Sequence, residues 1–171
     1  MDIIIDGYNL IGAEQGLRRQ LDSQRQRLVQ KLKDYQALKG YNVIVVFDGW
    51  QNGGDRESSE KVGGVTVTYS RQGVKADQVV IDVARTKGAG CVVVSTDREI
   101  RRAIERFGGV AISSSEFSDV LGALDRVLVG GGDEPDWYDS NDDDGGRGGR
   151  GHLRLSKAEK KRLDKLRKLK I

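Results

Sequence analysis

The sequence predicts an α/β fold built around a mostly parallel sheet that helices cover on both faces. Three observations predict it. Short apolar runs alternate with stretches of helical periodicity, the runs are apolar throughout rather than at every second residue, and turn-forming residues follow them. Continuous apolar strands are typical of parallel sheets, because both faces of such a strand are buried. In this kind of sheet, ligands bind beyond the carboxyl ends of the strands.

The first half of the chain holds three expected strands and one long helix. Residues 3–5 and 43–47 are β-branched runs that each end in an Asp-Gly pair, and residues 65–69 alternate as a strand does. Between the first two runs, apolar residues recur at near-helical spacing up to Gly40, a suitable helix C-cap. They are Leu17, Leu21, Leu28, Leu32, Tyr35 and Leu38.

The second half repeats this alternation. Residues 77–87 carry apolar side chains on one helical face, and residues 91–94 are a continuous apolar run typical of a buried strand. Residues 96–99, Thr-Asp-Arg-Glu, fit a capping box that opens another helix. Residues 110–112 are expected to form a short strand and residues 115–129 a closing helix.

Composition divides the chain into three parts. Residues 1–129 have the usual size of one compact domain. Residues 130–151 are acidic and then rich in glycine and arginine, too polar to bury a core, which predicts a flexible linker. Residues 152–171 place leucines among lysines and arginines, with a second capping box at Ser156 and Glu159, which predicts a basic amphipathic helix.

The charges are distributed as unevenly as the composition. The whole chain carries +3, but residues 1–132 carry +1, residues 133–151 carry −5 and residues 152–171 carry +7. A basic terminal segment is typical of proteins that bind nucleic acid or another anionic surface, although a merely solubilising tail has the same composition. The N-terminus has no signal-peptide pattern. The chain has a single cysteine, Cys91, so it forms no internal disulfide. We therefore expect a soluble, cytoplasmic protein.

Four aspartates stand where expected strands give way to loops or helices. Asp6 and Asp48 follow the first two strands, Asp77 begins a helix, and Asp97 follows residues 91–94. Because the carboxyl ends of parallel strands share one edge of a sheet, these side chains are expected to converge. Clustered carboxylates repel one another unless they take up protons or a cation, and a set of oxygens alone favours Mg²⁺ or Mn²⁺. Such a site supports hydrolysis of phosphodiesters.

Each aspartate also has a structural interpretation. Asp77 and Asp97 stand where aspartate caps a helix or favours its N-terminal end. Asp6 and Asp48 each precede glycine, an ordinary turn pair. Asp82 lies on the solvated face of its expected helix, so we leave it out of the site. The argument for a site therefore rests on all four aspartates reaching the same edge of one sheet.

Elimination narrows the chemistry. The only histidine, His152, lies beyond the glycine-rich segment, so a catalytic triad, a histidine-based ribonuclease mechanism and a Cys/His zinc site all lack parts. A metal-bound water is then the expected nucleophile, and its attack on phosphorus leaves a 5′-phosphate and a 3′-hydroxyl. A phosphatase or a DNA nuclease stays open as an alternative, because metal and carboxylates do not select the sugar.

Four stretches stand in an order that is known from one family. Residues 3–11 read Ile-Ile-Ile-Asp-Gly-Tyr-Asn-Leu-Ile, residues 43–48 form a strand that ends in aspartate, residues 75–77 read Lys-Ala-Asp, and residues 95–97 read Ser-Thr-Asp. In this order they resemble the NYN domains of the PIN-like nuclease superfamily, and among them the YacP-like bacterial branch with its D-G-Y-N motif. The resemblance runs to about Val129.

The resemblance implies a three-layer PIN-like (NYN) fold and an endoribonuclease that acts on mRNA or ribosome-associated RNA. By position, it implies Asp6, Asp77 and Asp97 as ligands of Mg²⁺ or Mn²⁺, directly or through water, with Asp48 as a fourth acidic wall. It also implies that Asn9 orients a ligand or the phosphate. The alternative for Asn9 is a side chain that holds its own turn.

RNA is expected to approach this edge over basic residues. Arg98 and Arg102 share a face of one helix and are candidates for phosphate contacts, and Tyr8, beside Asp6, is a candidate for base stacking. Further candidates are Arg71, Lys75 and Arg101, and, in the basic tail, Lys157, Lys160, Lys161 and Arg162. The main alternative is a non-catalytic RNA- or ribosome-binding module of the same fold, in which the acidic pocket is structural.

Overall fold

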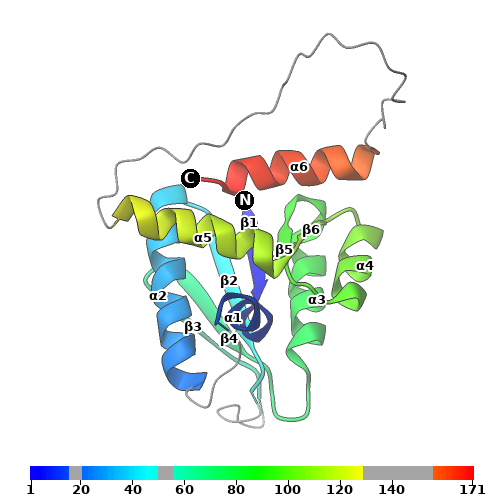
Figure 1. Cartoon of the computed structure of the whole chain (residues 1–171). Coiled ribbons are helices and arrows are strands. Elements are labelled where there is room, and N and C mark those ends of the chain that lie inside the picture. Colours follow the sequence, from blue (N-terminus) through cyan, green and yellow to red (C-terminus); the bar gives the residue numbers. More distant parts are fainter. Residues whose placement is uncertain (16–20, 50–55, 129–155) are drawn as a thin grey trace, which may run out of the picture.

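The computed structural model describes residues 1–15, 21–49, 56–128 and 156–171. In these residues six strands form one sheet in the order β3-β4-β2-β1-β5-β6 (Figure 1). All neighbouring strands are parallel except β3 and β4. The mostly parallel sheet that the sequence predicts is therefore confirmed. The strands are β1 Asp2–Asp6, β2 Asn42–Phe47, β3 Ser58–Val62, β4 Val65–Tyr69, β5 Val92–Val94 and β6 Val110–Ile112.

Helices cover both faces of the sheet, which makes three layers (Figure 1). On one face lie α1 (Gly7–Gln15), α2 (Leu21–Lys39) and α5 (Ser114–Leu128). On the other lie α3 (Ala76–Lys87), followed by the short 3-10 turn η1 (Gly88–Gly90), and α4 (Arg98–Arg106). A last helix, α6 (Lys157–Leu169), lies across the amino ends of the strands (Figure 1).

The apolar strands bury both of their faces, as their composition predicts. In β1, Ile3 and Ile5 pack into the cluster beneath α1, α2 and α5, whereas Ile4 packs into the cluster beneath α3 and α4. All three side chains are fully buried. This alternation fixes the register of the central strand, because a shift by one residue would exchange the two faces.

The sequence does not predict two of the elements. Helix α1 begins directly after Asp6, where the Asp-Gly pair indicates a turn, and a Cβ at Gly7 would collide with the ring of Phe47. Four of the five residues of strand β3 are polar and exposed, so the strand lacks the apolar pattern of the other strands. It forms an antiparallel edge with β4 through Gly63 and Gly64, whose φ values of 55° and 86° suit a tight hairpin.

Two details of the predicted helices are wrong. The residue that caps α4 is Asp97 rather than Thr96, because the Asp97 side chain accepts hydrogen bonds from the backbone of Glu99 and Ile100. Leu38, expected on the apolar face of the helix before Gly40, is 55% exposed. Leu17, assigned to the same helix, lies outside the described residues.

The basic helix forms as predicted, with the capping box between Ser156 and Glu159. Its packing was not predicted, because Leu169 is completely buried in the core and the hydroxyl of Tyr35 donates a 3.0 Å hydrogen bond to the Leu169 carbonyl. The helix is thus part of the folded body. The predicted linker, residues 130–151, lies outside the described residues. Within the described residues, no helix is both long and apolar enough to cross a membrane.

Candidate active site at the carboxyl ends of the strands

The fold brings the four aspartates to one edge of the sheet. Asp6 is the last residue of β1, and Asp48 directly follows β2. Asp77 lies in the first turn of α3, and Asp97 stands between β5 and α4. Since β2, β1 and β5 are parallel neighbours, their ends point the same way and meet at this edge.

Asp6 is the most perturbed of these carboxylates. The residue is only 6% exposed, and its pKa is raised from 3.8 to about 6, chiefly by burial. The charges of Asp77 and Asp97 contribute to this rise in the pKa, while hydrogen bonds from the backbone of Asn9 and from Ser95 oppose it. The folded protein thus holds a carboxylate whose negative charge is poorly compensated by its own surroundings.

The pKa of Asp77 is raised as well. Burial raises its pKa, and the neighbouring charges of Asp97 and Asp48 act in the same direction, against the cation of Lys75. Each aspartate therefore lies within electrostatic range of at least one other. A cation between them would relieve this repulsion, so a positive ligand is the species that the edge favours.

Asp97 caps helix α4. Its Oδ1 accepts hydrogen bonds of 2.7 Å from the backbone N–H of Glu99 and 3.1 Å from that of Ile100, which fixes the start of α4. Both bonds use the same oxygen. Capping and a role toward a ligand are therefore compatible, and the capping interpretation from the sequence is confirmed without excluding the other.

The side-chain donors at this edge are carboxylate oxygens, a donor type that divalent cations such as Mg²⁺ prefer. In the residues that the structure describes, no three Asp, Glu, His or Cys side chains lie close enough to form a ready-made metal cage. Mg²⁺ rarely needs one, because it keeps several waters and uses one or two carboxylates together with substrate oxygens. The oxygen-only donors and the raised pKa values of Asp6 and Asp77 fit such a cation.

Ser95 connects Asp6 with Asp97, a role that was not predicted from the sequence. Its hydroxyl donates to Oδ2 of Asp6 at 3.4 Å and accepts from the backbone N–H of Asp97 at 3.1 Å. The side chain is completely buried. A signal was present, since Ser95 is a hydroxyl residue that directly follows an apolar strand and stands two residues before Asp97.

Asn9 holds the surrounding loops together. Its backbone N–H donates to Oδ1 of Asp6 at 3.2 Å, and its side-chain oxygen accepts from the backbone N–H of Thr96 at 2.9 Å and from the hydroxyl of Ser114. The side chain thus connects α1 with the loop after β5 and with the start of α5. It does not simply hold its own turn, which corrects one of the two interpretations from the sequence.

Tyr8 is half-buried rather than presented to solvent. Its ring packs edge-on against Phe47 with the ring centres 5.3 Å apart, and its hydroxyl accepts a 3.3 Å hydrogen bond from Arg25. Arg25 was missed from the sequence. Arg25 lies three residues before Leu28 and seven before Leu32, so it shares their buried face of α2. A cation on an apolar helix face was the feature of the sequence that could have identified it.

The expected RNA-contacting cations fall into two separate places. Arg98 and Arg102 are exposed on α4, whose first turn lies beside Asp97, and Lys75 is exposed next to Asp77. The cations of α6 lie at the opposite, amino edge of the sheet (Figure 1). The structure therefore does not bring the two predicted groups together.

The cations of α6 also differ in what they contact. Lys157 and Lys160 are exposed. Lys161 donates to the carbonyls of Ala89 and Gly108, and Arg162 pairs with Glu116. Lys157 and Lys160 are therefore available to a partner, whereas Lys161 and Arg162 bind α6 to the rest of the domain.

Comparison with known proteins places the chain among relatives of the same architecture. The family model of the YacP-like NYN domain matches residues 3–168, which extends the resemblance from about Val129 to the end of α6. The uncharacterized protein YacP of Bacillus subtilis is 34% identical over 90 residues, which are 50% of this chain and 52% of that protein. The chain is thus aligned with about half the length of this relative.

Two crystal structures of Rae1 (YacP) from Bacillus subtilis, one of them a mutant, share the fold. They superpose with TM-scores of 0.62 and 0.61 at 27% and 26% identity. Each covers 75% of this chain, and 79% and 78% of the respective solved chain. The PIN-like α/β fold is therefore common to these proteins.

Proposed function

This chain belongs to the family of YacP-like NYN domains, and we propose that it is a metal-dependent endoribonuclease. The observation that carries the proposal is the buried carboxylate of Asp6, whose pKa is raised to about 6 beside Asp77 and Asp97 at the ligand-binding edge of a PIN-like sheet. Carboxylates that are buried close to one another favour a divalent cation. Membership of a nuclease-like superfamily indicates hydrolysis of a phosphodiester as the class of reaction.

Asp6, Asp77 and Asp97 would hold Mg²⁺ or Mn²⁺, some of them through water, with Asp48 as a further acidic wall. The bound ion would supply an activated water and stabilise the charge on the leaving oxygen. Asp97 keeps its carboxylate in place through the cap of α4, and Ser95 positions Asp6. Arg98 and Lys75, both exposed beside these aspartates, would hold the flanking phosphates of the RNA.

The proposed substrate is single-stranded mRNA or ribosome-associated RNA, hydrolysed to a 5′-phosphate and a 3′-hydroxyl. The cations of Lys157 and Lys160 on α6 support a large polyanionic target, because they are exposed far from the carboxylates. A cytoplasmic setting is part of the proposal and agrees with the buried free thiol of Cys91.

A second candidate is an RNA- or ribosome-binding module without catalysis. It is favoured by one observation, that no three metal-ligating side chains come together within the described ranges. Both candidates use the same basic surfaces, so binding alone does not distinguish them.

One assay separates these functions. The full chain is incubated with single-stranded RNA, single-stranded DNA and a small phosphate ester, each with Mn²⁺, Mg²⁺ or EDTA. We expect cleavage of RNA alone, loss of cleavage in EDTA, and 5′-phosphate ends on the downstream fragments. Binding of RNA without cleavage under any metal condition would favour the non-catalytic module, and 2′,3′-cyclic phosphate ends would contradict attack by water.

A further inference from the structure

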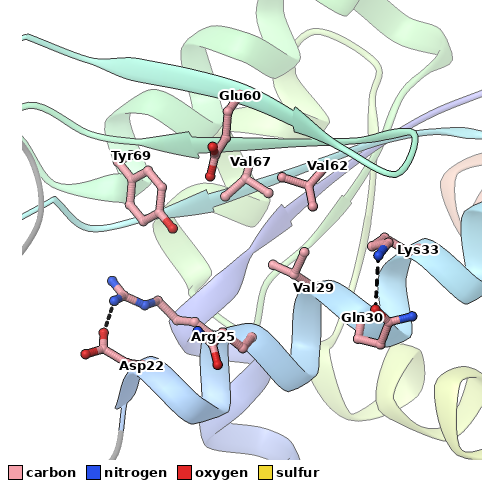
Figure 2. Close-up of a pocket in the computed structure, with 10 residues that line it drawn as sticks. Asp22, Arg25, Val29, Gln30, Lys33, Glu60, Val62, Val67 and Tyr69 are labelled. Atoms are coloured by element: carbon pink, nitrogen blue, oxygen red, sulfur yellow. Dashed lines mark hydrogen bonds and ion pairs between the residues drawn. The ribbon is translucent and has the colours of Figure 1, made fainter.

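A groove of about 500 Å³ lies between α2 and the β3–β4 hairpin, and the proposed function gives it no task (Figure 2). Its floor is apolar and consists of Val29, Val62 and Val67. Its rim is polar and includes Arg25 and Lys33 from α2 and Glu60 from β3. This size lies within the range of small-molecule pockets, so the groove is large enough for part of a polymer to enter.

Aromatic rings connect the groove to the candidate active site. Tyr69 lines the groove and stacks on Phe47 with the ring centres 5.8 Å apart, and Phe47 directly precedes Asp48. Phe47 also contacts Tyr8, two residues after Asp6. The ends of β4, β2 and β1 are neighbours in the sheet, so the groove opens beside the edge that carries the carboxylates.

Arg25 is held in the groove by several contacts. Its guanidinium pairs with Asp22, donates to the Tyr8 hydroxyl at 3.3 Å, and lies 5.7 Å from the centre of the Tyr69 ring (Figure 2). The residue is only 6% exposed. A planar cation fixed in this way forms a rigid end wall of the groove.

The chemistry of the groove selects one kind of ligand. An apolar floor with a hydrogen-bonding rim matches a flat group whose faces are apolar and whose edges are polar. The rim carries two carboxylates and two cations, so its formal charges cancel and it does not attract a sugar-phosphate backbone. A nucleobase turned inward from a single strand satisfies both conditions.

We propose that this groove binds one nucleobase of the RNA strand, next to the scissile phosphate, and prefers a base with an amino group. The proposal rests on the proposed function for its substrate. The preference follows from Glu60, whose carboxylate only accepts hydrogen bonds and points across the groove toward α2 (Figure 2). Adenine and cytosine offer it an amino group, and uracil does not.

Binding of short RNAs to the full chain tests the proposal. The Asp6→Asn variant is used so that the probes stay intact, and fluorescence anisotropy measures its affinity for labelled decamers of adenylate, cytidylate and uridylate. We expect the first two to bind about tenfold more tightly than uridylate, the effect of one hydrogen bond to a charged group. Equal affinity for all three would overturn the proposal.

Glu60→Gln and its matched control decide whether the groove is responsible. Glu57→Gln removes the same charge from the exposed residue just before β3, outside this groove. We expect Glu60→Gln to abolish the preference for amino-bearing bases and Glu57→Gln to retain it. If both variants behave alike, the groove does not read the base. Filling the groove with Val29→Trp should weaken binding of all three decamers at an unchanged melting temperature.

The two proposals fail in different ways. If the wild-type chain cleaves no RNA but the base preference depends on Glu60, the groove proposal holds as a binding site and the catalytic proposal is wrong. If the chain cleaves RNA and neither affinity nor KM depends on Glu60, the catalytic proposal holds and the groove proposal is wrong.

Discussion

The hydroxyl of Ser95 stands between two aspartates, donating to Oδ2 of Asp6 and accepting from the backbone N–H of Asp97. Because its bond to Asp6 lowers the pKa of that carboxyl, Ser95→Ala should move the acidic limb of the pH profile of kcat/KM upward. We also expect kcat to fall by about tenfold. Ser59→Ala, which loses a hydroxyl contact at the far side of the sheet, is the control. An unchanged pH profile would make Ser95 a purely structural residue.

Asp6→Asn and Asp97→Asn should each lower the rate of RNA cleavage by about a hundredfold or more, because each removes a negative oxygen from the proposed metal site. Asparagine caps helices as well as aspartate does, so Asp97→Asn should leave α4 intact. Asp82→Asn on the exposed side of α3 is the matched control. Cleavage rates and circular dichroism are measured together, and wild-type rates in both site variants would refute the metal site.

The raised pKa of Asp6 predicts how stability depends on pH. In the metal-free protein, the folded state retains a proton that the unfolded state releases between pH 3.8 and about 6. The free energy of unfolding should therefore fall as pH rises through this window, by about 3 kcal/mol from this group. Asp6→Asn should lack that part of the pH dependence and be more stable than wild type at pH 8.

Urea unfolding in EDTA at pH 4.5 and pH 8 measures this effect. Adding Mn²⁺ at pH 8 should stabilise the wild-type chain and leave Asp6→Asn nearly unchanged, because a ligand that binds only the folded state adds to its stability. The same pH dependence in both proteins would show that Asp6 is not desolvated.

Leu169 tests the packing of α6. Since this side chain is fully buried in the core, Leu169→Ala should lower the free energy of unfolding by about 2–5 kcal/mol. Leu163→Ala, on the same helix but 40% exposed, should change it by less than about 0.5 kcal/mol. For the same reason, deletion of the basic helix should destabilise the domain and lower activity even on short RNA. Equal melting temperatures for the two leucine variants would contradict the packing.

Lys157 and Lys160 test the RNA-binding role of α6 without disturbing the fold. Both are exposed, so the double change to glutamine should leave the melting temperature and cleavage of a short RNA unchanged. It should weaken capture of a long RNA and lower the salt dependence of that binding, because fewer counterions are released. Binding isotherms at several salt concentrations measure this, and an unchanged salt dependence would leave α6 with a structural role only.

The sequence by itself determined five of the six described strands, most of the helices and the aspartates at the strand ends. Each of these follows from a local pattern, such as the β-branched run before Asp6 or the capping box at Ser156. Local patterns survive folding because they reflect short-range preferences of the backbone and the burial of neighbouring side chains. The resemblance of the opening residues to NYN domains added the family, which the comparison confirms.

Only the tertiary structure decided which residues from distant parts of the chain lie side by side. The order of the strands brings Tyr69 and Phe47 together, the packing of α2 places Arg25 in the groove, and burial of Leu169 fixes α6 at the edge away from the aspartates. Polar residues such as those of β3 form a strand because a neighbouring strand offers hydrogen bonds, not because of their own composition. These outcomes depend on contacts between residues far apart in the chain, which the periodicity of any one segment does not contain.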